Sequence, residues 1–167
     1  MNEVIRQTAL FVRDLLTYDE QLIRLGRKNY DIEDFSIAYI GVDTLGASVR
    51  MGGGERFDPV AEVMSYQQQF QTPVTLSFYG DGAWTRATEF SLRIKSQKSF
   101  ELQTAQGIAV FLASGLTDVK VLTGQQYGER QELTLNVQFG ISVNIDTLRI
   151  DTEQINLTTE IGTETYP

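Results

Sequence analysis

The chain has 167 residues, a hydrophobic share of 41% and a formal net charge of -8. It contains neither histidine nor cysteine, which excludes histidine-based catalytic triads, disulfide frameworks and thiolate metal sites. The negative net charge argues against nucleic-acid binding through phosphate neutralisation. No run of about 18 apolar residues is present, which argues against a membrane span.

The N-terminal part predicts one helix and two short strands. Residues 3–16 carry apolar side chains at helical spacing, which predicts an amphipathic helix packed on a core: Ile5, Ala9, Val12 and Leu16, widened by Leu10, Phe11 and Leu15. A short strand is expected at 21–25 and another at 35–43, with a turn-rich connection between them.

Residues 44–58 form a glycine-rich segment that contains Gly52, Gly53 and Gly54. It is not a P-loop, because no Gly-Lys-Ser/Thr follows. Three consecutive glycines have high backbone entropy and supply few contacts of their own. We therefore predict a flexible hairpin loop that becomes ordered against a neighbouring subunit.

Residues 62–80 predict a long strand. Val74, Leu76 and Phe78 alternate with polar residues, and Pro73 predicts an edge position or a bulge because it cannot donate to a ladder. The stretch "YQQQFQ" upstream is uncharged and strand-prone, so as a free edge it would risk aggregation. Its pairing with a neighbour makes three residues candidates for a subunit interface: Tyr66, Gln68 and Phe70.

Residues 80–98 predict a second helix with Asp81 as its N-cap, followed by a short helix over 99–108 that ends at Gly107. The buried stripe of the second helix is expected to contain Ala83, Trp84, Ala87, Phe90 and Ile94. Core packing is the preferred role for Trp84, the single tryptophan.

The second helix is basic within an acidic chain. Residues 84–98 hold four positive residues against Glu89 alone, a net charge of +3: Arg86, Arg93, Lys95 and Lys98. Two interpretations stay open. The residues either solvate the helix and favour its C-terminus, or form a docking face for an acidic partner.

Residues 127–146 predict a second long ribbon, in which Leu133, Leu135, Val137 and Phe139 share one face. Fully extended, it would span roughly 50 Å. A strand-like acidic tail follows over 147–167. The order predicts one α+β domain over 1–146, with an antiparallel sheet of long ribbons and two to three helices packed on one face.

The search for chemistry is negative. The acidic stretches "DIED", "ERFD" and "DTE" match neither an EF-hand nor an HExxH pattern, and no serine lies in a GxSxG elbow. We predict no catalytic residue, no metal site and no cofactor.

The order of elements resembles the neck or tail-terminator (tail-completion) proteins of long-tailed bacteriophages. The resemblance covers most of residues 1–143 and rests on the helix 3–16, the strand ending "TPVTLSFYG", the helix "AWTRATEFSLRI" with its short follower, and the strand "YGERQELTLNVQF". The opening of that last strand adds Glu129 and Arg130 to the interface candidates.

The resemblance implies a structural virion protein rather than an enzyme. It implies a homo-oligomeric ring, usually of six subunits, that assembles in the host cytoplasm, caps the tail tube protein and joins it to the head-side connector. Genomic DNA would pass through the lumen without specific binding, and no membrane would be involved. An acidic lumen would repel DNA phosphates.

Three alternatives stay open. One is a different neck or tail adaptor or head-completion ring. Another is a carboxylate-dependent enzyme or small-ligand-binding protein, which a buried acidic pair in a deep pocket would favour. The third is an interaction domain that forms no ring.

Overall fold

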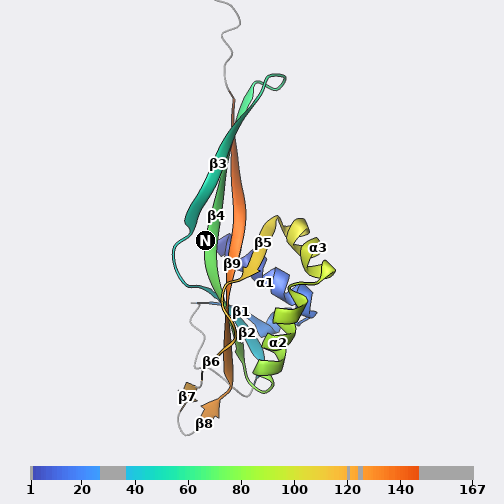
Figure 1. Ribbon diagram of the computed structural model, residues 1–167, viewed down its shortest axis with the longest axis vertical. Helices are drawn as coiled ribbons and strands as arrows, with labels where there is room; N and C mark the ends of the chain where they lie inside the picture. Colours follow the sequence, from blue (N-terminus) through green and yellow to red (C-terminus); the bar gives the residue numbers. More distant parts are fainter. Residues whose placement is uncertain (1, 27–36, 120, 124–125, 147–167) are drawn as a thin grey trace, which may run out of the picture.

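The computed structural model describes residues 2–26, 37–119, 121–123 and 126–146, which form the α+β fold that the sequence predicted (Figure 1). The helices are α1 (Asn2–Leu16), η1 (Glu20–Leu22, a 3-10 turn), α2 (Ala83–Arg93) and α3 (Gln97–Gln106). The strands are β1 (Ile23–Leu25), β2 (Tyr39–Thr44), β3 (Val49–Asp58), β4 (Val63–Tyr79), β5 (Ile108–Leu112), β6 (Thr117–Asp118), β7 (Val121–Thr123), β8 (Gln126–Gly128) and β9 (Arg130–Asp146).

Two strands of 17 residues each, β4 and β9, run the length of the molecule as an antiparallel pair. Their register is unbroken from Val63 opposite Asp146 to Tyr79 opposite Arg130. β2 and β3 share the other edge of β4, while β5 and β6 lie along the other edge of β9. β1 joins β2 in parallel, so the predicted antiparallel sheet is in fact mixed.

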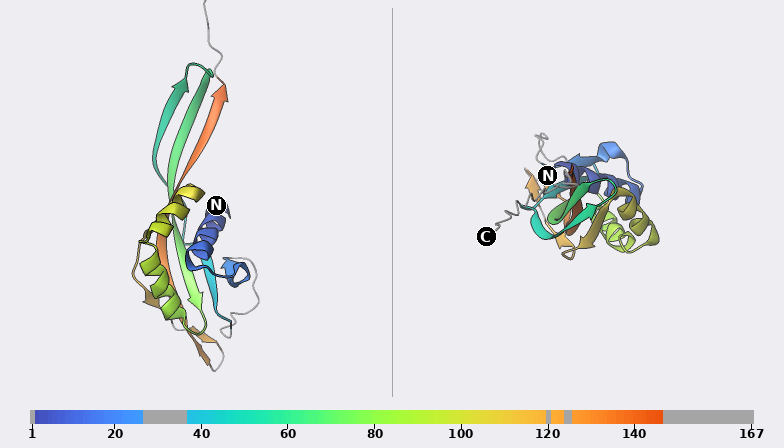
Figure 2. Two further views of the ribbon diagram at one scale, coloured as in Figure 1. Left: turned by 90° about the vertical axis from the view of Figure 1, so that its right-hand side faces the viewer. Right: turned by 90° about the horizontal axis from the view of Figure 1, so that it is seen from above.

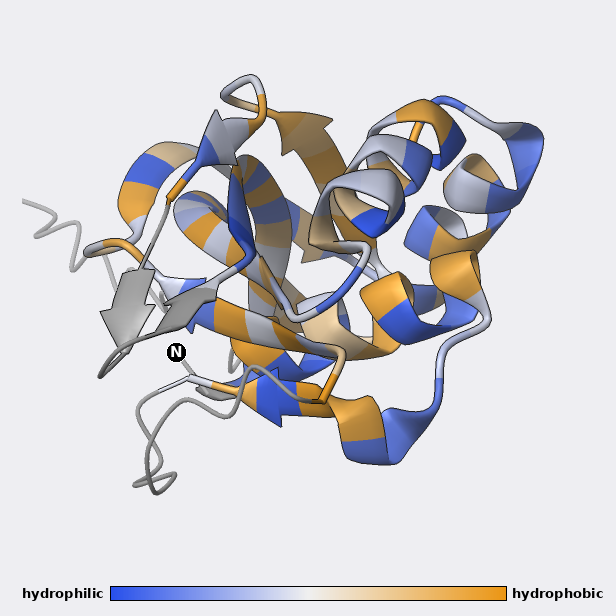
Figure 3. Ribbon diagram, turned by 90° about the horizontal axis from the view of Figure 1, so that it is seen from below, coloured by the Kyte–Doolittle hydropathy of each residue, from blue (hydrophilic) through white to orange (hydrophobic). Residues whose placement is uncertain are grey.

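The core lies between one face of the lower sheet and the helices (Figure 2). Alternation along β4 and β9 directs Val74, Leu76, Leu133 and Leu135 towards the helices, and Figure 3 shows the resulting apolar and polar bands. Three phenylalanines join the layers: the ring centroid of Phe90 lies 6.4 Å from that of Phe11 and 6.2 Å from that of Phe78.

The two helices predicted over 80–98 and 99–108 are both present, but the first is shorter than predicted and the second begins two residues earlier. α2 ends at Arg93, and the Ser96 side chain caps α3 by accepting a hydrogen bond from the Ser99 N–H. The N-cap of α2 is Gly82 in the left-handed region, with no side-chain cap bond, so the prediction for Asp81 was wrong. The end of α3 at Gly107, with φ of 65°, is confirmed.

Trp84 was wrongly predicted to be buried; its side chain is 59% exposed. Ala83, Ala87, Phe90 and Ile94 do form the buried stripe. Position 84 lies about 100° around the helix from position 83, at the border of that stripe. Helical spacing alone does not decide whether a residue at this border faces the core or the solvent. Here the buried positions are filled by Ala83, Ala87 and Phe90, and Trp84 faces outwards.

The segment predicted as a flexible loop is largely the strand β3. Gly52, Gly53 and Gly54 pair with Gln69, Gln68 and Gln67 of β4, after a bulge next to Arg50. Glycine is required by space at only one of the three positions, since a Cβ at Gly53 would lie 2.7 Å from the carbonyl oxygen of Gln67. The free edge of β4, rather than local propensity, makes this segment a strand.

Pro73 lies in the central strand β4, not at the edge position or bulge that the sequence predicted. Its carbonyl accepts a hydrogen bond from the Leu45 N–H at 3.0 Å, just beyond the end of β2. The N–H and C=O of one residue point to the same side of an antiparallel strand. The missing N–H of Pro73 therefore faces the gap between the end of β2 and the start of β3, where neither strand pairs with it.

Two predicted segments lie at least partly outside the described residues. The turn-rich connection and the acidic tail over 147–167 fall largely or wholly outside the described residues, so the domain boundary at 146 stays a prediction. Among the helices in the described ranges, none has the length and apolar character needed to cross a bilayer.

The end of α1 contains a strained residue that predicts a stabilising substitution. Thr17 has φ of 57°, and the Tyr18 N–H bonds to the Arg13 carbonyl at 2.9 Å in the helix-terminating motif that favours glycine. Thr17→Gly should raise the free energy of unfolding by about 1 kcal/mol. Thr17→Ala, which keeps the Cβ atom, should gain less in the same denaturant titration. Equal gains would show that backbone strain is not the cause.

Candidate assembly surfaces

The upper parts of β3, β4 and β9 project beyond the helices as a three-stranded ribbon, which we call the β-arm (residues 49–71 and 138–146; Figures 1 and 2). All ten residues of β3 are exposed, as are residues 140–145 of β9. The arm exists because β4 and β9 are longer than the helix layer that covers them.

The β-arm has one mainly apolar face and one polar face. The mainly apolar face, called the apolar face below, also carries Gln68 and, on β3, Glu55 opposite Tyr66 and Arg50 opposite Phe70. The register places Met64 opposite Ile145, Tyr66 opposite Val143, and Phe70 opposite Phe139, on the same side of the sheet as the core. Phe57 pairs with Met64 and extends this face onto β3. The other side carries mainly polar residues: Arg56, Ser65, Gln67, Gln69, Gln71, Gln138, Ser142 and Asn144.

The apolar face is open to solvent at its outer end, where Ile141, Val143 and Ile145 are each more than half exposed. Monomeric proteins rarely leave contiguous apolar surface of this kind uncovered, and such surface marks interaction sites. The alternation Phe139, Ile141, Val143, Ile145 is visible in the sequence, but the sequence analysis carried it only as far as Phe139. Comparing the length of that pattern with the short helices would have revealed the arm.

The three predicted interface residues of β4 lie together on this apolar face. Phe70 stacks on Phe139, with centroids 5.6 Å apart and planes at 21°. Tyr66 is 40% exposed. The Gln68 side chain accepts from Arg50 Nε and donates to the carbonyl oxygens of Gly52 and Gln69, so it stabilises the arm across its strands.

The outer edge of β9 is open beside the arm. β5 and β6 cover it only as far as Phe139, and among the described residues nothing pairs with that edge from residue 140 onward. Residues 140–145 contain no charged side chain. Edge strands are usually protected by charge, proline or a bulge, so this edge is suited to pairing with another strand.

The tip of the arm is an acidic turn between β3 and β4. The Asp58 carboxylate accepts hydrogen bonds from the N–H groups of Val60 and Ala61 at 2.9 and 3.2 Å. These bonds, that from Ala61 foremost, hold the pKa of Asp58 below its usual value. Glu62 closes the turn with φ of 55°. The tip therefore stays negatively charged at neutral pH.

The four basic residues do not form one docking face. The Arg86 guanidinium donates to the carbonyl oxygens of Tyr79 and Asp81, both at 2.6 Å. Arg93 donates to the Leu15 carbonyl at 3.0 Å and pairs with Glu89 at 2.6 Å, which links α2 to the end of α1. Both arginines thus hold the fold together.

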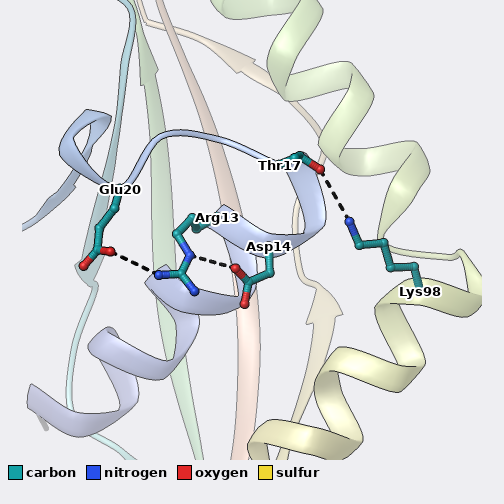
Figure 4. A network of polar contacts seen from close by, with 5 residues as sticks. All are labelled: Arg13, Asp14, Thr17, Glu20 and Lys98. Atoms are coloured by element: carbon teal, nitrogen blue, oxygen red, sulfur yellow. Dashed lines mark hydrogen bonds and ion pairs between the residues drawn. The ribbon is translucent and has the colours of Figure 1, made fainter.

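Lys95 and Lys98 are exposed near the junction of α2 and α3. Lys98 lies 3.5 Å from the Thr17 hydroxyl (Figure 4). Beside it, Arg13 bonds Asp14 at 2.7 Å and Glu20 at 3.2 Å, and the Asp14 hydrogen bond contributes most to raising the pKa of Arg13. Of the four basic residues, these two lysines are exposed, whereas Arg86 and Arg93 are half-buried and bonded to backbone carbonyls of their own chain.

The sheet face opposite the helices has a hollow of about 410 Å³. The Tyr39 and Tyr79 rings stack in it at 4.3 Å, and the Arg130 guanidinium lies 5.1 Å from the Tyr79 ring. Glu132 is paired with Arg130 at 2.5 Å and accepts a bond from Ser77. Arg130 thus has partners within its own chain, whereas Glu129 is exposed beside it.

This hollow does not have the features that would favour an enzyme. Asp43 and Glu132 both line it, yet Glu132 is neutralised by Arg130, and Asp43 accepts a bond from the Thr44 N–H at 2.7 Å. In the described part of the chain, no group of three or more acidic side chains is placed to hold a metal ion.

An α+β domain that carries a projecting amphipathic arm and an open strand edge has the surface features of a protein that assembles with other chains. The family model for the phage neck terminator protein matches residues 2–163, so the chain belongs to that family. It is therefore a structural component of the phage neck, as the sequence resemblance implied. Among curated proteins, no match was found.

The tip of the arm should respond to pH through Asp58. Because the folded pKa is lowered, the carboxylate stabilises the turn above its unfolded pKa, and this contribution is lost as pH falls through the folded pKa. Amide exchange at Val60 and Ala61 should therefore accelerate in acid beyond the intrinsic pH trend. In Asp58→Asn that extra acceleration should be absent, and in Asp58→Ala protection should be low at every pH. A wild-type profile parallel to that of Asp58→Asn would contradict the assignment.

Single substitutions should distinguish a basic residue that stabilises the fold from one that is only exposed, through the free energy of unfolding. Arg86→Ala removes two charge-assisted bonds to backbone carbonyls and should lower the free energy of unfolding by about 1 to 2 kcal/mol. Lys95→Ala should change it by less than about 0.5 kcal/mol. Denaturant titrations followed by circular dichroism measure both. Similar losses would mean that Arg86 does not hold the end of β4 to α2.

Proposed function

We propose that this protein forms a closed ring in the neck of a tailed phage, where it ends the tail tube and joins it to the head-side connector while DNA passes through the lumen. The observation that carries the proposal is the β-arm. An apolar face and an open strand edge extend beyond the domain's own core, and a ring of identical subunits is a closed arrangement that covers such surfaces in every copy.

The charge of the chain supports the DNA-conducting role. With -8 at neutral pH, the chain repels phosphate rather than neutralising it. A lumen formed from such subunits would let the genome slide past without binding it. Assembly in the host cytoplasm suits a chain without cysteine, because that compartment is reducing.

A different neck or tail adaptor ring is the main competing role. Tube proteins stack on copies of themselves, whereas a terminator presents two unlike faces and stops further addition. Purified protein added to growing tail tubes should therefore fix their length. If tubes continue to lengthen and incorporate the added chain along their walls, the terminator role is wrong although the family assignment stands.

The ring itself is tested by mass and by images. The purified chain at raised concentration, or the chain bound to tail tubes, should give one closed species, with six copies as the expected number. Native mass spectrometry counts the copies, and electron microscopy of the same sample shows whether they close around a lumen. Isolated single copies both in free solution and on the particle would refute the ring.

A further inference from the structure

We propose that the apolar face of the β-arm packs on the outer surface of α2 in the next copy of this chain. The inference rests on the proposed ring and identifies the two surfaces that would meet in it. One surface is the outer part of the arm face. The other, which we call the α2 stripe, is a line along α2 and just past its end (Trp84, Thr88, Leu92 and Lys95), in which Thr88 is half-buried and the other three residues are exposed.

The two large apolar residues of the α2 stripe lie outside the core that the described residues form. The residues of the stripe follow one another at spacings of four, four and three, so they lie along one side of the helix. Trp84 is 59% exposed and Leu92 is 71% exposed. The adjoining side of the same helix, with Ala83, Ala87 and Phe90, is fully buried. α2 thus has apolar residues on both of these sides, and the outer ones are unexplained by the core.

The two surfaces also match in length. From Val63 at the base of the tip to Gln68, β4 rises about 16 Å. The 11 residues of α2 rise about 16 Å as well. The part of the arm between these limits carries Ile141, Val143 and Ile145, the three exposed apolar residues of β9.

Charge sets the direction in which the arm lies on the helix. Residues 57–66 at the tip contain two acidic residues, Asp58 and Glu62, and no basic one. Residues 94–100 at the end of α2 contain Lys95 and Lys98 and no acidic one. With the tip at these lysines, Ile145 lies near Leu92 and Ile141 lies near Trp84. Such complementarity fixes register and raises the association rate.

A second copy is the occupant that these observations favour. Both surfaces belong to the same chain, and they are different patches, so a contact between them is head-to-tail and repeats from copy to copy. Head-to-tail contacts form a ring when the rotation between neighbouring copies closes, and an open filament when it does not. Arm-to-arm contact would be isologous and would stop at a dimer, leaving the α2 stripe uncovered.

Cysteine cross-linking tests the contact directly, because the chain has no cysteine of its own. Ile145→Cys and Leu92→Cys are prepared as separate proteins, mixed, assembled and treated with a short thiol cross-linker. A link between the two variants can form only between copies. The matched control is Asn144→Cys, the neighbouring residue on the polar face, mixed with Leu92→Cys. The first pair should give roughly tenfold more cross-linked dimer than the control, since contact raises the effective thiol concentration.

The outcomes separate this inference from the ring. If native mass shows a ring but Ile145→Cys links no better than Asn144→Cys, the arm-to-α2 contact is wrong and the proposed function stands. Preferential cross-linking between two copies of Ile145→Cys would indicate an arm-to-arm contact in place of the arm-to-α2 contact. If neither solution nor tail tubes yield a ring, both proposals fail.

Tryptophan fluorescence gives a second measurement, because Trp84 is the single tryptophan. Its emission should shift to shorter wavelength on assembly, as the ring of Trp84 loses contact with water. Trp84→Ala should weaken assembly, whereas Phe111→Ala should not. Phe111 is 51% exposed and pairs with Asn136 of β9, which places it on the polar side of the sheet. An unchanged spectrum in a ring of confirmed mass would overturn the inference.

Discussion

The pairing of β4 with β9 over 17 consecutive residues is the constraint on which the rest of this structure depends. One antiparallel ladder fixes the alternation of both strands for the whole length of the molecule, because a slip of one residue would exchange the two faces everywhere. Where helices cover the inward face, the alternation makes a core. Where the helices end, the same alternation makes an exposed apolar surface. Core and arm are thus one continuous sheet face.

The remaining edges of the pair are divided among shorter strands. β2 and β3 meet along β4 at Pro73, and β5 and β6 cover β9 only as far as Phe139. The lower half is therefore held by neighbours on both sides and by helices on one face, whereas the arm is held only by ladder bonds and side-chain contacts among its own three strands. Packing supplies most of the stability of a domain, so local opening should begin in the arm.

Much of the fold could be predicted because strong periodicity is a local property. The spacing of apolar residues predicts the first helix and both long strands. A single residue type, the glycine at 107, predicts the end of α3. β3 could not be predicted, because its glycines favour disorder and only the edge of β4, distant in the sequence, orders them. Likewise, Trp84 and Ala83 are adjacent in sequence, and only the position of the sheet decides which of them is buried. For the surfaces, the uncharged, strand-prone stretch around Tyr66 and Phe70 made them interface candidates, and both lie on the arm; their interface role stays a prediction. The roles of Arg86 and Arg93 depend on backbone carbonyls that no sequence pattern shows.

The composition of the two faces explains how a subunit can carry such surfaces before it assembles. The outer apolar residues alternate with polar ones along each strand, and the polar face carries glutamine, serine and asparagine rather than a second apolar layer. A net charge of -8 adds repulsion between free copies. In salt this repulsion acts only within about 10 Å, so it opposes random close approach, whereas an apolar contact acts at contact distance. A neighbour that is already aligned, with its lysines facing the acidic tip, can still be held by the arm.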